Sequence, residues 1–271
     1  MVGRYPYGQV ANGTTNLKDV MAKVLFYDIE TAPNLAYVWG HYDQNVVQQY
    51  REWYLMCFAY RWEHQKKTKV VSLIDFERYN EDPEDDTDVA QALWDLFDEA
   101  DIVVAHNGDK FDMRKANARF IVHGLSAPSA LQQIDTLKVA RKYFMFNSNK
   151  LGDLGQHLRL GKKESTGGFE LWVGCMKGEA KAWSRMIKYA RQDVNLLMDV
   201  YYKLRPFMNN HPNKNIIDDT VDHCPTCSGT KLMRRGYRRN RTTSYTQLQC
   251  VDCGSYCRER TKSNEVTPTV V

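Results

Sequence analysis

The chain has 271 residues, of which 43% are hydrophobic and 26% are charged, and its net charge is +4. This composition is close to that of soluble globular proteins and excludes a fibrous or largely disordered chain. No apolar run approaches the roughly 20 residues that a membrane-spanning helix needs, and the first residues lack the pattern of a secretory signal. We therefore expect an intracellular, cytoplasmic protein that does not bind membranes.

Hydrophobic patterning predicts strands first and then strands that alternate with helices. The predicted strands cover residues 24–30, 53–62, 69–74, 101–105 and 133–136, and the predicted helices cover residues 89–99, 110–124, 137–145, 151–158 and 180–206. Asp86, Thr87 or Asp88 is expected to cap the first of these helices with its side chain. This order of elements favours an α/β fold with a mixed sheet flanked by helices.

The length favours one large domain with a small appendage. We expect an N-terminal tail at 1–20, a large α/β domain at 21–206, a linker rich in Pro and Asn at 207–222, a small cysteine-containing domain at 223–260 and a C-terminal tail at 261–271. The positive charge is concentrated in the small domain, since residues 224–260 contain eight Lys or Arg and only Asp252 and Glu259 as acids. Such a basic segment can attract a phosphate backbone.

The first motif is an acidic pair on the first predicted strand. Asp28 and Glu30 are two residues apart, so both side chains leave the same face of the sheet. Two carboxylates this close repel each other unless a cation lies between them, and Mg²⁺ or Mn²⁺ takes oxygen ligands of this kind. Taken alone, the pair could equally lie on a solvated strand edge.

Two further motifs follow later in the chain. Asn107-Gly-Asp-Lys-Phe-Asp112 comes after a predicted strand and opens a helix, and Tyr189-Ala-Arg-Gln-Asp193 lies within the last long helix. The four-residue spacing puts Tyr189 and Asp193 on one helical face. Either motif alone is compatible with an ordinary loop or a solvated helix stripe.

In combination and in this order, the three motifs resemble those of the DEDD exonuclease superfamily, and the tyrosine marks the DEDDy subgroup. Ile134-Asp-Thr136, Leu151-Gly-Asp-Leu154, Gly168-Phe-Glu-Leu-Trp172 and Trp183 add a resemblance to stand-alone relatives of the exonuclease domain of family B DNA polymerases. The resemblance spans about residues 24–203. It implies a ribonuclease-H-like fold and a 3′-to-5′ exonuclease that releases nucleoside 5′-monophosphates.

The resemblance also implies the roles of individual residues. Asp28, Glu30, Asp112 and Asp193 would hold two Mg²⁺ or Mn²⁺ ions, and Tyr189 would orient the attacking water. A tyrosine with an ordinary pKa near ~10 is a poor general base at neutral pH, which favours the orienting role. The resemblance further places Asn107 and Phe111 near the terminal nucleotide and the backbone of Thr31 near the 3′-hydroxyl, although Asn107 and Phe111 could also be a loop-stabilising and a core residue.

The C-terminal domain carries a second metal pattern. Cys224-Pro-Thr-Cys227 and Cys250-Val-Asp-Cys253 have the C-x₂-C spacing of two knuckles around one structural Zn²⁺, and Gly229 and Gly254 suit the knuckle turns. This pattern predicts a zinc ribbon. Two alternatives are open: a pair of disulfides, and replacement of one ligand by Cys257 or His223.

Between the knuckles, Arg235, Arg238, Arg239 and Arg241 form a basic run that is suited to phosphate contacts, with tyrosines interleaved. We expect nucleic acid as the partner, with single-stranded DNA favoured over RNA. Contact of the ribbon with a replication or repair protein is the alternative.

Three other functions compete with a DNA exonuclease. The first is an RNA-trimming enzyme of the same superfamily, which would differ only in contacts to the 2′-hydroxyl. The second is a non-catalytic nucleic-acid-binding protein, which the complete carboxylate set disfavours. The third is a transposase or integrase core, whose acidic residues would not show this pattern.

Overall fold

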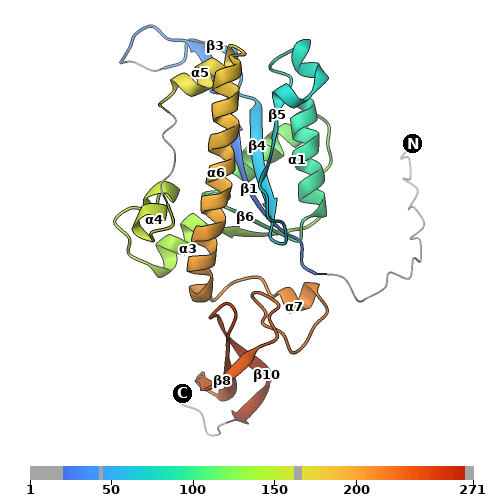
Figure 1. Ribbon diagram of the computed structural model, residues 1–271, viewed down its shortest axis with the longest axis vertical. Helices are drawn as coiled ribbons and strands as arrows, with labels where there is room; N and C mark the ends of the chain where they lie inside the picture. Colours follow the sequence, from blue (N-terminus) through green and yellow to red (C-terminus); the bar gives the residue numbers. More distant parts are fainter. Residues whose placement is uncertain (1–20, 43–44, 162–166, 266–271) are drawn as a thin grey trace, which may run out of the picture.

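The computed structural model describes residues 21–42, 45–161 and 167–265 (Figure 1). The expected tail at 1–20 and the last six residues, 266–271, lie outside this range. Among the described helices, none has both the length and the hydrophobicity needed to cross a bilayer.

The larger body contains a sheet and the helices that cover it. Its strands are β1 (Val24–Thr31), β2 (Leu35–Tyr37), β3 (Gln48–Arg51), β4 (Leu55–Trp62), β5 (Lys69–Ser72), β6 (Ile102–Ala105) and β7 (Gln132–Asp135). Its helices are α1 (Thr87–Glu99), α2 (Asp112–Val122), α3 (Thr136–Tyr143), α4 (Leu151–His157), α5 (Glu170–Met176) and α6 (Ala180–Leu204). Short 3₁₀ turns cover Leu73–Asp75, Glu77–Asn80 and Arg205–Phe207.

The main sheet has the order β5-β4-β1-β6-β7. β1 pairs antiparallel with β4, and β4 pairs antiparallel with β5, whereas β1, β6 and β7 are parallel. The predicted mixed sheet flanked by helices is therefore confirmed. The central strands are almost entirely buried, which agrees with their near-continuous apolar sequences.

The alternation of side chains along β1 assigns its two faces. The ring of Tyr27 packs edge-on against Phe97 of α1 at 4.9 Å between centroids, and the ring of Phe26 packs against Tyr201 of α6 at 5.1 Å. Successive side chains of a strand point to opposite faces, so Asp28 and Glu30 share the α6 face with Phe26. The long helix α6 runs along this face of the sheet (Figure 1).

β1 extends beyond its parallel neighbour. Its pairing with β6 ends at Phe26 opposite Val104, whereas its pairing with β4 continues to Thr31. The end of β1 that carries the acidic pair therefore lies beyond the carboxyl end of β6. A ligand site forms in α/β sheets at such an edge, outside the carboxyl ends of the strands.

Three features of the larger body differ from the sequence-based expectation. Helix α5, Glu170–Met176, forms in a stretch where no helix was predicted. β2 and β3 form a hairpin that the sequence did not predict, and exposed aromatic side chains such as Tyr37, Trp39 and Tyr50 lie on it. The start of α1 also differs. Asp86 is at the N-cap position of α1, but its side chain does not cap the helix.

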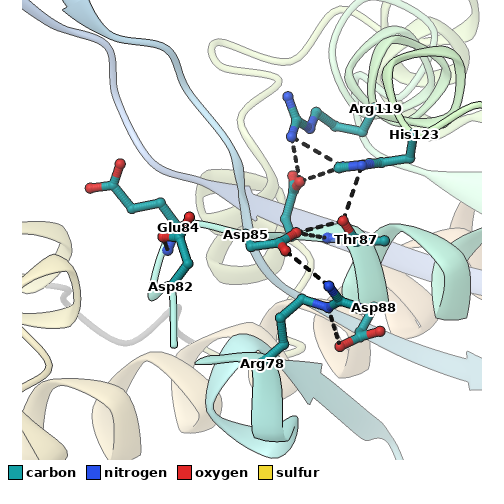
Figure 2. Close-up of polar contacts among 9 residues, drawn as sticks. Arg78, Asp82, Glu84, Asp85, Thr87, Asp88, Arg119 and His123 are labelled. Atoms are coloured by element: carbon teal, nitrogen blue, oxygen red, sulfur yellow. Dashed lines mark hydrogen bonds and ion pairs between the residues drawn. The ribbon is translucent and has the colours of Figure 1, made fainter. Parts of the chain in front are cut away.

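Asp86 is instead the centre of a buried polar network. Its carboxylate accepts hydrogen bonds from the backbone N–H of Leu55 at 2.7 Å, from His123 Nε2 at 2.6 Å and from the guanidinium of Arg119. Figure 2 shows the neighbouring contacts that join Thr87 to His123 and Asp85 to Thr87. Asp86 has no exposed surface, so its side chain stabilises the packing of α1, α2 and β4 rather than a helix end.

The C-terminal body is a three-stranded antiparallel sheet formed by β8 (Leu232–Arg239), β9 (Thr243–Cys250) and β10 (Tyr256–Glu265). β10 continues five residues beyond the expected end of the small domain at 260. This body lies beyond the end of α6, whereas α5 and the β2–β3 hairpin lie near the other end of that helix (Figure 1).

The expected linker at 207–222 packs against both bodies. It contains the short helix α7 (Lys214–Ile217), and the ammonium of Lys214, which is 4% exposed, pairs with Glu63. The backbone N–H of Lys214 donates to the carbonyl of Pro225 at 2.8 Å, and Ser228 donates to Asp218 at 2.5 Å. These contacts hold the C-terminal sheet at a defined place on the larger body.

Candidate active site

Three of the predicted carboxylates lie close together. Asp28 and Glu30 come from β1, and Asp193 comes from the middle of α6, and one ligand oxygen from each lies within 4.8 Å of the others. Glu30 is 9% exposed and Asp193 is 2% exposed. Carboxylates buried so closely need a cation to offset their mutual repulsion, and the oxygen donor set suits Mg²⁺ or Mn²⁺. The residues present therefore fit the expected divalent metals.

Asp112 approaches the same strand from the opposite side. It is the first residue of α2, it is 2% exposed, and its Oδ1 accepts a hydrogen bond from the backbone N–H of Ile29 at 3.1 Å. Burial raises the pKa of Asp112 to about 7, and the nearby Asp135 carboxylate adds to this rise. A carboxyl group with such a pKa loses its proton near neutral pH, where a bound cation would favour the charged form.

Tyr189 lies one turn before Asp193 on α6 and is 7% exposed. Burial raises the pKa of its phenol above the ordinary value, and the carboxylates of Glu30, Asp193 and Asp28 raise it further. The phenol is therefore protonated at neutral pH and can donate a hydrogen bond, but it cannot act as a general base. Its ring packs edge-on against Trp172 of α5 at 6.2 Å between centroids.

An open cavity of about 960 Å³ begins at these residues. Asp28, Tyr189 and Asp193 line one side, and Asn107 and the segment from Asn147 to Gln156 line the other. Asn107 has a φ of +70°, an uncommon conformation outside glycine that asparagine tolerates best. This conformation places Asn107 at the cavity wall directly after β6.

A smaller, more apolar pocket of about 400 Å³ lies at the end of β1. Thr31 lines it together with Trp53, Phe169 and Trp172, and the ammonium of Lys115 lies over the Trp53 ring at 3.5 Å. Trp172 lines both this pocket and the larger cavity. Phe111 is 39% exposed and does not line either one, although Lys115 lies 5.7 Å from its ring centroid.

Two residues that the sequence did not single out support the site. His106 joins the wall segment to the sheet, because its Nε2 donates to the carbonyl of Asn149 at 2.9 Å and its Nδ1 lies 2.8 Å from Thr136 Oγ1. Asp135 accepts the backbone N–H of Asn107 at 2.9 Å. The feature that could have identified both residues is their position at the carboxyl ends of β6 and β7, where parallel strands form a ligand site.

The four cysteines of the knuckles also gather. One Sγ atom from each of Cys224, Cys227, Cys250 and Cys253 lies within 4.8 Å of the others, and the Cys224–Cys253 and Cys227–Cys250 pairs are each 3.6 Å apart. These spacings are too long for disulfides and near the roughly 3.8 Å between thiolates that share a tetrahedral Zn²⁺. The cluster fits one zinc ion and is compatible with a zinc ribbon.

The two knuckle glycines differ in how strictly the geometry requires them: Gly254 has a left-handed backbone, whereas a side chain at Gly229 would mainly displace the exposed Asp252 carboxylate. Gly254 has a φ of +75° in the turn after Cys253. A Cβ atom at Gly229 would lie 2.5 Å from the Asp252 carboxylate and 3.2 Å from the sulfur of Cys227. Cys257 and His223, the alternative ligands, are not part of the four-sulfur group.

The basic residues of the ribbon are not brought to the carboxylates. Arg235 donates from Nε to the side-chain oxygen of Gln249 at 2.9 Å, and Arg239 lies 5.7 Å from the ring centroid of Tyr237. Arg235, Arg238, Arg239 and Arg241 are exposed, and none of them lines the cavity at the carboxylates. They belong to a separate surface of the molecule.

Comparison with known proteins defines the class. The RNase_H superfamily model matches residues 55–205, which is more than half of the chain, and the chain therefore belongs to the RNase H superfamily. The match begins after β1, so Asp28 and Glu30 lie outside it. No curated protein matches the chain.

Among solved structures, the fold is similar to that of the family B DNA polymerase from the hyperthermophilic archaeon Pyrobaculum calidifontis, with a TM-score of 0.51 and 15% identity. The similarity covers 69% of this chain and 25% of the polymerase chain, so this protein corresponds to about a quarter of that enzyme. Both findings are consistent with the DEDD exonuclease superfamily that the motifs indicated. Membership of the RNase H superfamily supports a nuclease-type function, whereas the similarity to the polymerase shows the fold.

Proposed function

We propose that this protein is a metal-dependent 3′-to-5′ exonuclease that hydrolyses single-stranded DNA to nucleoside 5′-monophosphates. The observation that carries the proposal is the cluster of Asp28, Glu30 and Asp193 within 4.8 Å, of which Asp28 and Asp193 line an open cavity. Asp112 lies outside this group, and we include it in the proposed metal set because it contacts the β1 backbone between the two acids.

The residues present fit the chemistry of phosphodiester hydrolysis. Asp28, Glu30, Asp112 and Asp193 would hold divalent cations, which when bound supply an activated water and offset the charge on the phosphate and the leaving 3′-oxygen. Tyr189 lines the cavity, and its phenol, which is protonated and hydrogen-bonds to Asp193, would orient a water there. Burial of the carboxylates strengthens each electrostatic contact by excluding water.

The pocket beside Thr31 is suited to the last nucleotide of a nucleic-acid strand. Trp53, Phe169 and Trp172 offer flat apolar surfaces to a base, and Lys115 supplies a positive charge next to them. Stacking on aromatic side chains needs an unpaired base, which favours a single strand over a duplex. The polar wall near Asn107 would then contact the sugar and phosphate.

The test is digestion of 5′-labelled single-stranded DNA and of RNA of the same sequence, with Mg²⁺ or Mn²⁺, by the wild type and by Asp28→Asn. We expect a metal-dependent ladder that shortens from the 3′ end and is absent with the variant. Intact substrate in every reaction would contradict the proposal. A faster ladder on RNA would move the assignment to RNA trimming.

A further inference from the structure

A second cavity lies at the junction of the two bodies, away from the carboxylates. Its volume is about 440 Å³, within the range of small-molecule sites. Residues from the segment after α6, from the first knuckle and from all three strands of the C-terminal sheet line it. The main ones are His211, Arg238, Asn240, Tyr245, Tyr256 and Arg258.

The wall on the sheet side is built around Tyr245. Arg238 of β8 is the cross-strand partner of Tyr245, so both side chains lie on the same face of the sheet. Arg258 of β10 is the partner of Gln247, which also shares that face, and its guanidinium lies over the Tyr245 ring at 3.8 Å. The Arg258 guanidinium thus covers one face of the Tyr245 ring, and Arg238 is the neighbour of Tyr245 on the same face of the sheet.

The charge of the cavity has one sign. Arg238 and Arg258 are positive, and among the described residues that line the cavity none is acidic. Guanidinium groups bind phosphate with two parallel hydrogen bonds, and their flat faces stack with aromatic rings and bases. Asn209 adds an amide group that can pair with the edge of a base, and Asn240 adds its NH₂ group, since its oxygen accepts hydrogen bonds from Thr242 and Thr243. The lining therefore suits a phosphate next to a planar ring.

The walls are held in place by contacts that do not depend on a ligand. The hydroxyl of Tyr201 donates to Nε2 of His211 at 2.7 Å, and the backbone N–H of Lys214 donates to Pro225 at 2.8 Å. The ion pair between Lys214 and Glu63 fastens the same segment to β4. Because the cavity is preformed, its residues lose little conformational entropy when a ligand binds.

We propose that this junction cavity binds one nucleotide of single-stranded nucleic acid, with its phosphate at Arg238 and Arg258 and its base against Tyr245. The site is separate from the cleavage site, because the part of α6 from Asp193 to Leu204 alone spans roughly 16 Å. This proposal rests on the proposed function, because it takes the nucleic-acid substrate of the nuclease as the ligand. The cavity would hold that strand by an internal nucleotide while its 3′ end reaches the carboxylates.

The test measures binding without cleavage. Asp193→Asn protein with its zinc retained is titrated into fluorescein-labelled oligothymidylate and into the matching RNA, without added divalent cation, and anisotropy is followed. In this background Tyr245→Ala should raise the Kd by roughly 5- to 100-fold, the loss of one stacked base, whereas Tyr245→Phe should keep it. Arg238→Gln and Arg258→Gln should each lower the salt dependence of log Kd by about 0.7.

A matched control is present on the same sheet. Tyr237 also lies near two guanidinium groups, at 5.0 Å from Arg234 and 5.7 Å from Arg239, but it does not line the cavity. Tyr237→Ala should weaken binding much less than Tyr245→Ala. Equal losses, or wild-type binding by Tyr245→Ala with a full zinc content, would overturn the proposal and leave an acidic partner protein as the better occupant.

A competition experiment separates a strand from a free nucleotide. Thymidine 5′-monophosphate should displace the labelled strand only at far higher concentration than unlabelled oligothymidylate, and displacement at equal concentrations would overturn the assignment to a strand. Binding is measured in the Asp193→Asn variant, so it does not depend on cleavage. If only the nuclease proposal fails, the wild type will not cleave DNA or RNA, but Tyr245→Ala will still weaken binding.

Discussion

The backbone N–H of Ile29 donates a hydrogen bond to Oδ1 of Asp112 at 3.1 Å. This contact joins the first turn of α2 to β1 at the residue between Asp28 and Glu30. It is available because the pairing of β1 with β6 has already ended at Phe26, so this part of the strand has no parallel neighbour. A carboxylate from a helix start thereby takes the place of a strand partner beside the acidic pair.

The raised pKa of Asp112, about 7, makes the stability of the metal-free protein depend on pH. The folded pKa exceeds the ordinary value of 3.8, so this group's contribution is full below about pH 4 and is lost as the pH rises to about 7. Asp112→Asn removes this titration. We expect its free energy of unfolding to fall less than that of the wild type between pH 4 and 7, measured by urea unfolding without added divalent cation. Parallel curves would contradict the assignment.

Removing a carboxylate from the cluster should weaken metal binding. Asp193→Asn leaves a neutral amide beside Asp28 and Glu30, so Mn²⁺ affinity measured by titration calorimetry should fall by at least about tenfold, the scale of 1.4 kcal/mol. Asp199→Asn is the control, since Asp199 lies on the same helix but is exposed and outside the cluster. If both variants bind Mn²⁺ equally well, Asp193 is not a ligand.

The four-sulfur cluster predicts one bound zinc ion per chain. Cys227→Ser should abolish zinc retention and unfold the C-terminal sheet, because that sheet is small and depends on the metal for stability. Cys257→Ser should keep the zinc, since Cys257 is outside the cluster. Elemental analysis of both purified variants checks this prediction. Zinc loss in Cys257→Ser would show that a different cysteine set binds the metal.

The buried network around Asp86 should contribute much more than the exposed ion pairs beside it. Arg119→Met leaves the fully buried Asp86 carboxylate without its guanidinium partner and should cost about 3 kcal/mol in the free energy of unfolding. Arg78→Met is the control, because Arg78 pairs with Asp85 and Asp88 on the surface, where its side chain is 47% exposed (Figure 2). In chemical denaturation that change should lower the free energy of unfolding much less than Arg119→Met does, since exposed ion pairs contribute little. Similar costs would refute the contrast.

Acid should weaken the contact between the two bodies at His211. Burial lowers the pKa of His211 to about 4, and its Nδ1 donates to the carbonyl of Pro212 at 2.7 Å. Because the folded pKa lies below the ordinary value of 6.5, the stability from the neutral ring is full above pH 6.5 and is lost as the pH falls toward 4. His211→Gln should therefore show a flatter thermal stability profile from pH 6.5 to 4. The same slope in both proteins would exclude His211 as the cause.

Local spacing, together with the resemblance of the combined motifs to a known superfamily, was enough to predict the three carboxylates that the structure brings together. The two-residue spacing of Asp28 and Glu30 and the four-residue spacing of Tyr189 and Asp193 each fix a common face once the element type is known. The C-x₂-C spacing likewise brings the two cysteines of each pair together, since each pair forms one knuckle. The strand and helix types followed from hydrophobic periodicity, and the sheet has the predicted mixed character.

Asp86 illustrates what local spacing misses. Its position before a helix indicates a side-chain cap, and the sequence contains no signal that Arg119 and His123, more than thirty residues away, would pack against it. The β2–β3 hairpin was missed for another reason. Its side chains are mostly exposed on both faces, so no alternation of polar and apolar residues marks the strands.

The sequence by itself determined which residues can bind metal and to which class of fold they belong, because both depend on residue type and short-range periodicity. Only the tertiary structure decided that β1 extends past β6 to admit Asp112, and that the segment after α6 closes a cavity against Tyr245. Both arrangements join residues far apart in the chain. Their distances depend on how whole elements pack, and local sequence does not encode that packing.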